Sequence, residues 1–230
     1  MQTTRQTFCL IAACCAAASA WAQEYRALPD PWTEQMLNMQ KNHFELDSVN
    51  RSGNVCKLNG HFQGQGRQHV YEDGRGCRVV FAFHAQGVAV SIPEGSRPAC
   101  RAYCGHNVRM EGNYQRLPSA CRHSAEQQTA QRFQVAYLAG RFDEAIRLRN
   151  AWLQQCGRLV HALTQMRALN DLAAAYQKTG NQAACRRVLQ PWQAEIEDVK
   201  DANRPGSVFR EEYARELQTA RRHWQSCTPR

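Results

Sequence analysis

The sequence lacks the short motifs that identify many enzymes. It contains no Gly-x-Ser-x-Gly elbow, phosphate-binding loop, dinucleotide fingerprint or HExxH pair. After residue 22 it also lacks any apolar run near the ~18 residues that suggest a membrane-spanning helix. We therefore expect a chain that is not an enzyme, holds no cofactor and has no transmembrane segment after residue 22.

Lysine and runs of like charge are scarce. Basic residues outnumber acidic ones by 29 to 20, which gives a net charge of +9, yet only four of the basic residues are lysine. Acidic and basic side chains are interspersed along the chain, and no block of five or six like charges occurs. This pattern is typical of a solvated surface, so we expect no nucleic-acid partner.

The first 22 residues have the pattern of a signal peptide. Phe8 begins an unbroken apolar run that ends at Ala18, and Ala20-Trp21-Ala22 offers a small-x-small cleavage site. A lipoprotein box, Ile11-Ala12-Ala13-Cys14, is one competing interpretation, in which lipid is attached to Cys14; an uncleaved anchor is the other. The short, alanine-rich segment predicts export in a bacterium and a periplasmic location.

An even number of cysteines follows the predicted cleavage site. Removal of residues 1–22 leaves eight of the 11 cysteines. An even count behind a secretory signal indicates disulfide bonds. The eight are Cys56, Cys77, Cys100, Cys104, Cys121, Cys156, Cys185 and Cys227.

Glycine divides the chain near Cys121. Ten of the 14 glycines lie between residues 52 and 118, where they punctuate short strands, and few remain downstream. We predict an α+β protein with four segments: a signal peptide at 1–22, an entry segment at 23–51, a cysteine-bridged antiparallel β meander or small barrel at 52–120, and a helical-hairpin domain at 121–230. Trp32 in the entry segment is either an anchor on one of the domains or an ordinary surface residue.

The local patterns also place the elements. The entry segment is predicted to contain a helix at 33–44. Strands are expected at 55–59, 69–71, 77–84, 88–92 and 108–114, with a tight hairpin turn at 85–87. Helices are expected at 124–139, 143–155, 159–179, 182–199 with an interruption at Pro191, and 207–225 with Ser207 as its cap.

Helix direction predicts two of the disulfides. In an antiparallel hairpin the start of one helix lies beside the end of the next, which favours Cys121 with Cys156 and, further on, Cys185 with Cys227. The other four cysteines, in the β half, allow three pairings, and the sequence leaves them open. A zinc site on Cys100 and Cys104 with His106 is the alternative, which an oxidising compartment disfavours.

Two segments of the helical half repeat at an offset of 40 residues. The first runs from Ala136 to Ala145 and contains Gly140; the second reads Asn170 to Gly180. Trp152 matches Trp192 at the same offset. Both segments resemble tetratricopeptide repeats over about residues 125–200, in which small residues let paired helices approach and glycine allows the tight turn.

This resemblance implies a concave side formed by the first helix of each unit. The positions that it implies for partner binding are Gln134, Tyr137, Leu138, Arg167, Asn170, Gln177 and Lys178. Arg167 and Lys178 would make that side suited to an acidic peptide or a terminal carboxylate. The alternative is that the last helix covers the side with Phe209, Tyr213 and Leu217.

A second resemblance concerns the β half. The run from Cys100 to His106, followed by Glu111-Gly112-Asn113-Tyr114, is similar to small exported cysteine-bridged β domains that include periplasmic lysozyme inhibitors. It implies that the loop at 103–109 enters a hydrolase cleft; the alternative is a loop merely fixed by its cysteines. We therefore expect an exported, non-catalytic protein that binds an unidentified envelope protein or peptide, with a lysozyme-type inhibitor as the alternative.

Overall fold

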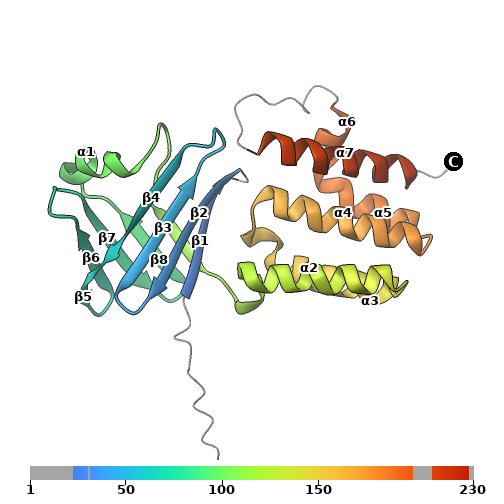
Figure 1. Cartoon of the computed structure of the whole chain (residues 1–230), viewed down its shortest axis with the longest axis horizontal. Coiled ribbons are helices and arrows are strands. Elements are labelled where there is room, and N and C mark those ends of the chain that lie inside the picture. Colours follow the sequence, from blue (N-terminus) through green and yellow to red (C-terminus); the bar gives the residue numbers. More distant parts are fainter. Residues whose placement is uncertain (1–22, 31, 199–208, 228–230) are drawn as a thin grey trace, which may run out of the picture.

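The computed structural model describes residues 23–30, 32–198 and 209–227. A β half is followed by a helical half, and the two lie side by side (Figure 1). The predicted signal peptide, the lipid site at Cys14 and the helix cap at Ser207 lie outside the described residues.

Nine antiparallel strands of the described chain form a nearly closed barrel. They are β1 (Gln23–Asp30), β2 (Thr33–Gln40), β3 (His43–Val49), β4 (Val55–His61), β5 (Gln63–Gln65), β6 (Gln68–Glu72), β7 (Arg78–His84), β8 (Gly87–Ser91) and β9 (Gly112–Arg116). Their order is β4-β3-β2-β1-β9-β8-β7-β6-β5. Only Phe62 separates β4 from β5, so the two outer members of this order are consecutive in the chain.

The barrel is filled by the inward side chains of its strands. In β3 the buried positions alternate, with Phe44, Leu46 and Ser48 inside. The ring of Phe44 lies 4.8 Å from that of Phe81 and 6.1 Å from that of Phe62, centroid to centroid. This aromatic cluster joins strands from both sides of the barrel, so the interior acts as a hydrophobic core.

The predicted helix at 33–44 is wrong. Residues 23–51, expected as an entry segment, contribute β1, β2 and β3 to the barrel. The inward positions of β2 are Gln35, Leu37 and Met39, while the apolar Met36 faces outward. Because a glutamine is buried and a methionine faces outward, the sequence of β2 does not show the alternation of apolar and polar residues that is typical of a strand. The other predicted strands are confirmed within a few residues, and the 85–87 turn joins β7 to β8.

Between β8 and β9 the chain covers one end of the barrel. It forms η1 (Glu94–Ser96), α1 (Arg97–Cys100) and η2 (Arg101–Tyr103), and then an irregular segment that leads to β9. The strand expected at 108–114 therefore begins later, at Gly112. Val108 and Met110 are nonetheless buried and close the end of the core.

The second half consists of helical hairpins. Its helices are η3 (Ser119–Cys121), α2 (His123–Leu138), α3 (Phe142–Cys156), η4 (Gly157–Leu159), α4 (Ala162–Lys178), α5 (Gln182–Leu189), η5 (Gln190–Trp192), α6 (Gln193–Glu197) and α7 (Arg210–Ser226). These match the predicted helices, including the interruption at Pro191. α2, α4 and α7 are stacked one above another (Figure 1). None of the helices in the described ranges is long and apolar enough to cross a membrane.

The turns of the two hairpins have the same geometry. Gly140 and Gly180 have φ angles of 73° and 72°, in the left-handed region that glycine adopts without strain. The amide of Arg141 donates to the carbonyl of Ala136 at 2.9 Å, and that of Asn181 donates to the carbonyl of Tyr176 at the same distance. The 40-residue repeat is therefore a repeat of local structure.

Each half contains two disulfides. The predicted pairs Cys121–Cys156 and Cys185–Cys227 are confirmed, with Cα atoms 5.3 and 5.9 Å apart. The barrel contains Cys56–Cys104 and Cys77–Cys100, with Cα atoms 4.0 and 4.6 Å apart. All four barrel cysteines are thus paired with one another, which favours disulfides over the zinc alternative, since a zinc ligand must be a thiolate.

The β1–β2 hairpin joins the barrel to the helices. Trp32, at its tip, packs edge-on against Tyr213, Trp192 and His161, with ring centroids 5.1, 6.0 and 6.1 Å away. On β1, Arg26 Nη1 donates to the carbonyl of Leu159 at 3.1 Å. Trp32 is therefore an anchor on the helical half, the first of the two predicted alternatives.

Candidate functional site

A groove of about 540 Å³ lies between α2, α4 and α7. We call it the helical groove. It is lined by Glu126, Gln127, Ala130, Phe133, Gln134, Arg149, Arg167, Asn170, Asp171, Ala174, Glu216, Thr219 and His223. The three helices that form it are α2 and α4, which start the two hairpins, and α7, which follows the second hairpin.

A buried arginine lies among the residues that line this groove. Arg149 of α3 is 3% exposed, and its Nε donates to Asp171 Oδ2 of α4 at 2.7 Å. Its guanidinium carbon lies 5.6 and 5.7 Å from the ring centroids of Phe133 and Trp152. Nη1 makes no hydrogen bond among the described residues and lies 3.9 Å from a carboxylate oxygen of Glu126. One charged side chain therefore links α2, α3 and α4.

Burial and charge set the pKa values of two groove residues. Burial raises the pKa of the Asp171 carboxyl; the neighbouring Arg149 opposes this, and Glu216 and Glu126 add to it. Burial and then the nearby charge of Arg222 lower the pKa of His223, whose Nδ1 lies 2.9 Å from Gln177 Oε1. The groove thus contains a carboxyl that resists ionisation and an imidazole that resists protonation.

Helix α7 provides partners for the residues predicted on α4. Arg167 forms ion pairs with Glu212 at 2.8 Å and with Glu216 at 3.2 Å. Asn170 is buried, and its Nδ2 donates to the carbonyl and the carboxylate of Glu216 at 3.0 and 2.9 Å. The two glutamates offset the positive charge expected of this side. An acidic peptide is therefore a poor match for the α4 part of the groove.

Both predicted arrangements of the last helix are realised in part. Tyr213 and Leu217 of α7 are buried with α4, as the covered alternative requires, and Phe209 is half-buried beside them. An adjoining face of α7 leaves the groove open, with Glu216 and His223 as one wall. The last helix is therefore a wall of the groove rather than a lid across it.

The remaining predicted positions differ in their surroundings. Gln134 lines the groove, and Leu138 follows it one turn later on the exposed side of α2. Tyr137 is half-buried and stacks on Phe133, with ring centroids 5.8 Å apart. Lys178 is exposed at the end of α4 and is not among the lining residues. The structure thus brings Gln134, Arg167 and Asn170 together and leaves Lys178 apart.

Sequence reasoning missed several residues of the groove, chiefly Arg149, Asp171, Glu216 and His223. The sequence does contain a pattern that predicts burial of Arg149. The buried residues of α3 are Ala145, Arg149, Trp152 and Cys156, spaced at helical intervals. A charged residue on an otherwise apolar stripe indicates a buried ion pair. Its partner on α4 could be named only from the packing of the two hairpins.

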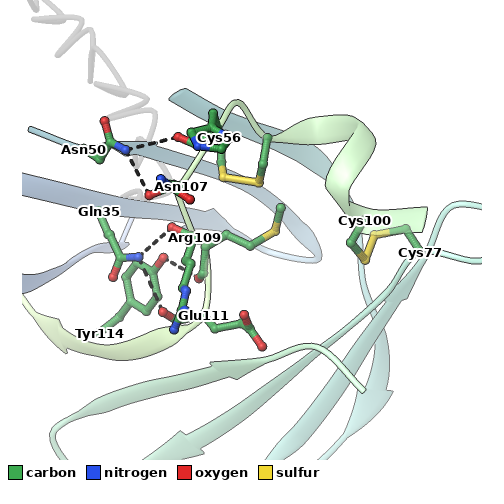
Figure 2. Close-up of a disulfide and its surroundings, with 12 residues drawn as sticks. Gln35, Asn50, Cys56, Cys77, Cys100, Asn107, Arg109, Glu111 and Tyr114 are labelled. Carbon is green, nitrogen blue, oxygen red and sulfur yellow. Dashed lines mark hydrogen bonds between the residues drawn. A yellow bond between two sulfur atoms is a disulfide. The ribbon is translucent and has the colours of Figure 1, made fainter. Parts of the chain in front are cut away.

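A second candidate site lies at the covered end of the barrel (Figure 2). The segment after Cys104 is held by side chains from β2 and from the β3–β4 loop. Asn50 Nδ2 donates to the carbonyls of His106 and Asn107 at 3.3 and 2.9 Å. The buried Gln35 donates to the carbonyl of Arg109 at 2.7 Å. The loop predicted to be fixed by its cysteines is therefore fixed by polar side chains as well.

Tyr103 ties the same end of the barrel to the β6–β7 loop. Its hydroxyl donates to Asp73 Oδ2 at 2.9 Å, and this bond, with burial, raises the pKa of Tyr103 to about 12. Burial acts to raise the pKa of Asp73, but hydrogen bonds from Arg75, Tyr103 and Cys77 outweigh it and lower that pKa. The pair thus remains a neutral phenol and a carboxylate over the physiological range.

Comparison with protein-family models, with curated proteins and with solved structures found no match to this chain. Among the described residues, no group of three or more histidine, cysteine, aspartate or glutamate side chains is placed to hold a metal ion.

Proposed function

We propose that the chain is an exported, non-catalytic protein-interaction protein of the bacterial envelope that binds its partner in the helical groove through tetratricopeptide-like hairpins. The observation that carries this proposal is the groove between three stacked helices, one of which, α2, also exposes apolar side chains outside the residues that line the groove. Of the large apolar residues that are mainly exposed in the described chain, Val135 and Leu138 are both on α2, at 56% and 74% exposure.

The chemistry of the groove favours a segment of mixed character. Glu126, Asp171 and Glu216 line it together with Arg149 and Arg167, so the groove has no excess of positive charge. Burial of two aliphatic side chains would contribute about 1.5–3 kcal/mol each if complete. A partner segment with apolar residues for the α2 rim and uncharged polar groups for the groove fits this surface best.

Two substitutions on α2 test the proposal. Val135→Ser with Leu138→Ser removes the exposed apolar rim while leaving the buried residues of α2, Phe133 and Ala136, unchanged. The mature protein and this variant are immobilised and exposed to envelope extract, and the retained proteins are identified. We expect at least one partner to bind the unaltered protein saturably and to be lost from the α2 variant.

The matched control is Val55→Ser, which removes an exposed apolar side chain, 41% accessible, from the barrel. It should retain the same partner with unchanged affinity. Thermal melting of each variant establishes that folding is intact. If the α2 variant and the control retain the same partners equally, the helical groove is not the binding surface.

The fixed loop at the barrel end supports a second candidate, a cell-wall hydrolase inhibitor of the lysozyme type. A loop held rigid before binding loses little conformational entropy on entering a cleft, and this one is tied by Cys56–Cys104 and by Asn50. Purified protein is incubated with lysozyme at increasing molar ratios. Stoichiometric loss of lysozyme activity supports this candidate; unchanged activity at excess removes it for that enzyme.

A further inference from the structure

A second depression, of about 790 Å³, lies at the covered end of the barrel, on the surface formed by α1, η2 and the segment before β9. We call it the barrel-end pocket. Its lining residues are Ile92, Arg97, Cys100, Arg101, Cys104, Gly105, His106, Asn107, Val108, Arg109, Met110 and Glu111. Three of these are arginines and one is acidic, so the pocket has a clear excess of positive charge.

The arginines approach the pocket from two sides. Arg97 and Arg101 are on the helical stretch of α1 and η2, and Arg109 is on the opposite segment. Arg97 is paired loosely with Glu111, at 3.5 Å. Within the described ranges, Arg101 and Arg109 form no ion pair within 4.0 Å, and both are exposed. Two guanidinium groups are therefore available to an anionic ligand.

The main chain that carries these arginines is fixed on both sides. Cys77–Cys100 holds the helical stretch to the β6–β7 loop, and Cys56–Cys104 holds the start of the opposite segment to β4. Gln35 and the hydroxyl of Tyr114 bind the carbonyls of Arg109 and Met110, both at 2.7 Å (Figure 2). A ligand would therefore order side chains only, and not the backbone of the pocket, which lowers the entropic cost of binding.

From this geometry we propose that the barrel-end pocket binds an extended peptide segment with carboxylates at alternate positions. Arg97 and Arg101 are four residues apart, a spacing that places Cβ atoms about 5–6 Å apart on a helix. Carboxylates on one side of an extended peptide recur about every 6.6 Å. An extended acidic segment can thus pair successive carboxylates with both arginines, while Arg109 reaches it from the other wall.

The placing of the arginines on two walls favours a peptide over a small inorganic anion. Ile92, Val108 and Met110 also line the pocket but are at most 8% exposed, so contacts with a ligand come chiefly from the arginines. An inorganic phosphate presents its charge at one point, whereas an extended acidic peptide presents successive carboxylates to arginines on both walls. This site is separate from the helical groove, which has no excess of positive charge, so the proposal does not depend on the function assigned to that groove.

A peptide titration tests the proposal on the full mature protein. The probe is a fluorescently labelled Glu-Ser-Glu-Ser-Glu-Ser peptide, with Gln-Ser-Gln-Ser-Gln-Ser and inorganic pyrophosphate as the comparison ligands. Binding is followed by anisotropy or competition at about 20 mM and about 200 mM salt, because ionic contacts weaken as the Debye length shortens. We expect saturable binding of the glutamate peptide, weaker at high salt, and none of the glutamine peptide.

Charge removal inside and outside the pocket completes the test. Arg101→Gln with Arg109→Gln should weaken binding of the glutamate peptide by about tenfold, since each loses a charge-assisted hydrogen bond at a partly solvated site. The matched control is Lys41→Gln with Arg67→Gln, which removes two positive charges from turns at the other end of the barrel. This control should bind within about twofold of the unaltered protein.

Three results would overturn the proposal. The first is the absence of saturable binding of the glutamate peptide at low salt. The second is an equal loss in the pocket variant and in the control, which would mean attraction by net charge alone. The third is displacement of the peptide by pyrophosphate at lower concentration than by unlabelled peptide, which would make the site one for phosphate.

Discussion

Replacement of Arg149 by methionine tests whether a buried ion pair holds the two helical hairpins together. The guanidinium group on α3 joins Asp171 on α4 and lies beside the rings of Phe133 and Trp152. Methionine retains much of the apolar stem, so contacts with the two rings are partly kept. What the substitution removes is the positive charge beside a carboxylate whose burial already raises its pKa.

The magnitude follows from the unequal burial of the pair. Removing one partner of a fully buried ion pair destabilises a protein by about 3–5 kcal/mol, because the other charge is left uncompensated. The Arg149 side chain is 4% exposed, but that of Asp171 is 30% exposed and remains partly solvated. We therefore expect a loss of about 2–3 kcal/mol in the free energy of unfolding, or about 4–12 °C in the melting temperature.

The loss should depend on pH. A carboxyl whose pKa is higher in the folded state binds its proton more tightly there, so its ionisation opposes folding as the pH rises above the unfolded value of 3.8. Without Arg149 the pKa of Asp171 rises further, and the destabilisation extends to higher pH. The difference in the free energy of unfolding between Arg149→Met and the unaltered protein should therefore be smaller near pH ~4.5 than near pH ~7.5.

Circular dichroism melting at these two pH values is the assay, with Arg149→Met/Asp171→Leu as the companion variant. Leucine removes the stranded carboxylate, so the double variant should recover at least about half of the lost stability. A melting temperature for Arg149→Met that matches the unaltered protein would refute the role of the ion pair. An equal deficit at both pH values would show that lost packing, and not the charge of Asp171, causes the destabilisation.

Three further changes have expected outcomes. Trp32→Ala removes the ring that joins the barrel to the helices and should lower the free energy of unfolding by about 3 kcal/mol. Amide hydrogen exchange should become faster in α4 and α7, while β7 and β8 stay protected. Because the pKa of His223 is lowered in the folded state, the contribution of its neutral form to stability is present above the unfolded pKa of 6.5 and is lost on acidification. The melting temperature of His223→Gln should therefore fall less than that of the unaltered protein as the pH decreases from ~7.5 to ~5. Gly140→Ala and Gly180→Ala should each destabilise the protein by about 1–2 kcal/mol in urea titrations, because both positions have a positive φ. A Cβ would meet open space at all three positions, so Gly95→Ala, at a position without a positive φ, should change stability little.

The helical half was predictable because its signals are local. Gly140 and Gly180 end helices in the same way, and the hairpin that each creates places the following helix antiparallel to the one before. Once those directions are fixed, the ends that carry Cys121 and Cys156 meet, as do those that carry Cys185 and Cys227. Nothing beyond neighbouring elements is needed for that inference.

The barrel half was harder because its decisive contacts are distant in sequence. The inward position of Gln35 depends on carbonyl groups more than 70 residues away, which accept the hydrogen bonds of its amide. Without those partners a buried glutamine in a strand would leave donors unsatisfied, so the local pattern favours a helix instead. The pairing of Cys56 with Cys104 likewise depends on how the segment after β8 returns across the barrel end.

The two candidate sites also differ in how far the sequence predicts them, because one is built from neighbouring helices and the other from segments distant in sequence. The helical groove includes positions predicted from a repeat, such as Gln134 and Asn170, because equivalent residues of successive hairpins fall on one side. Its charge was mispredicted because Glu212 and Glu216 belong to a helix outside the repeat. In the barrel-end pocket the arginines come from segments without regular period, and only closure of the barrel places Arg109 opposite Arg101. A sequence pattern therefore predicts which residues share a helix face, whereas the net charge of a surface depends on which distant elements pack beside it.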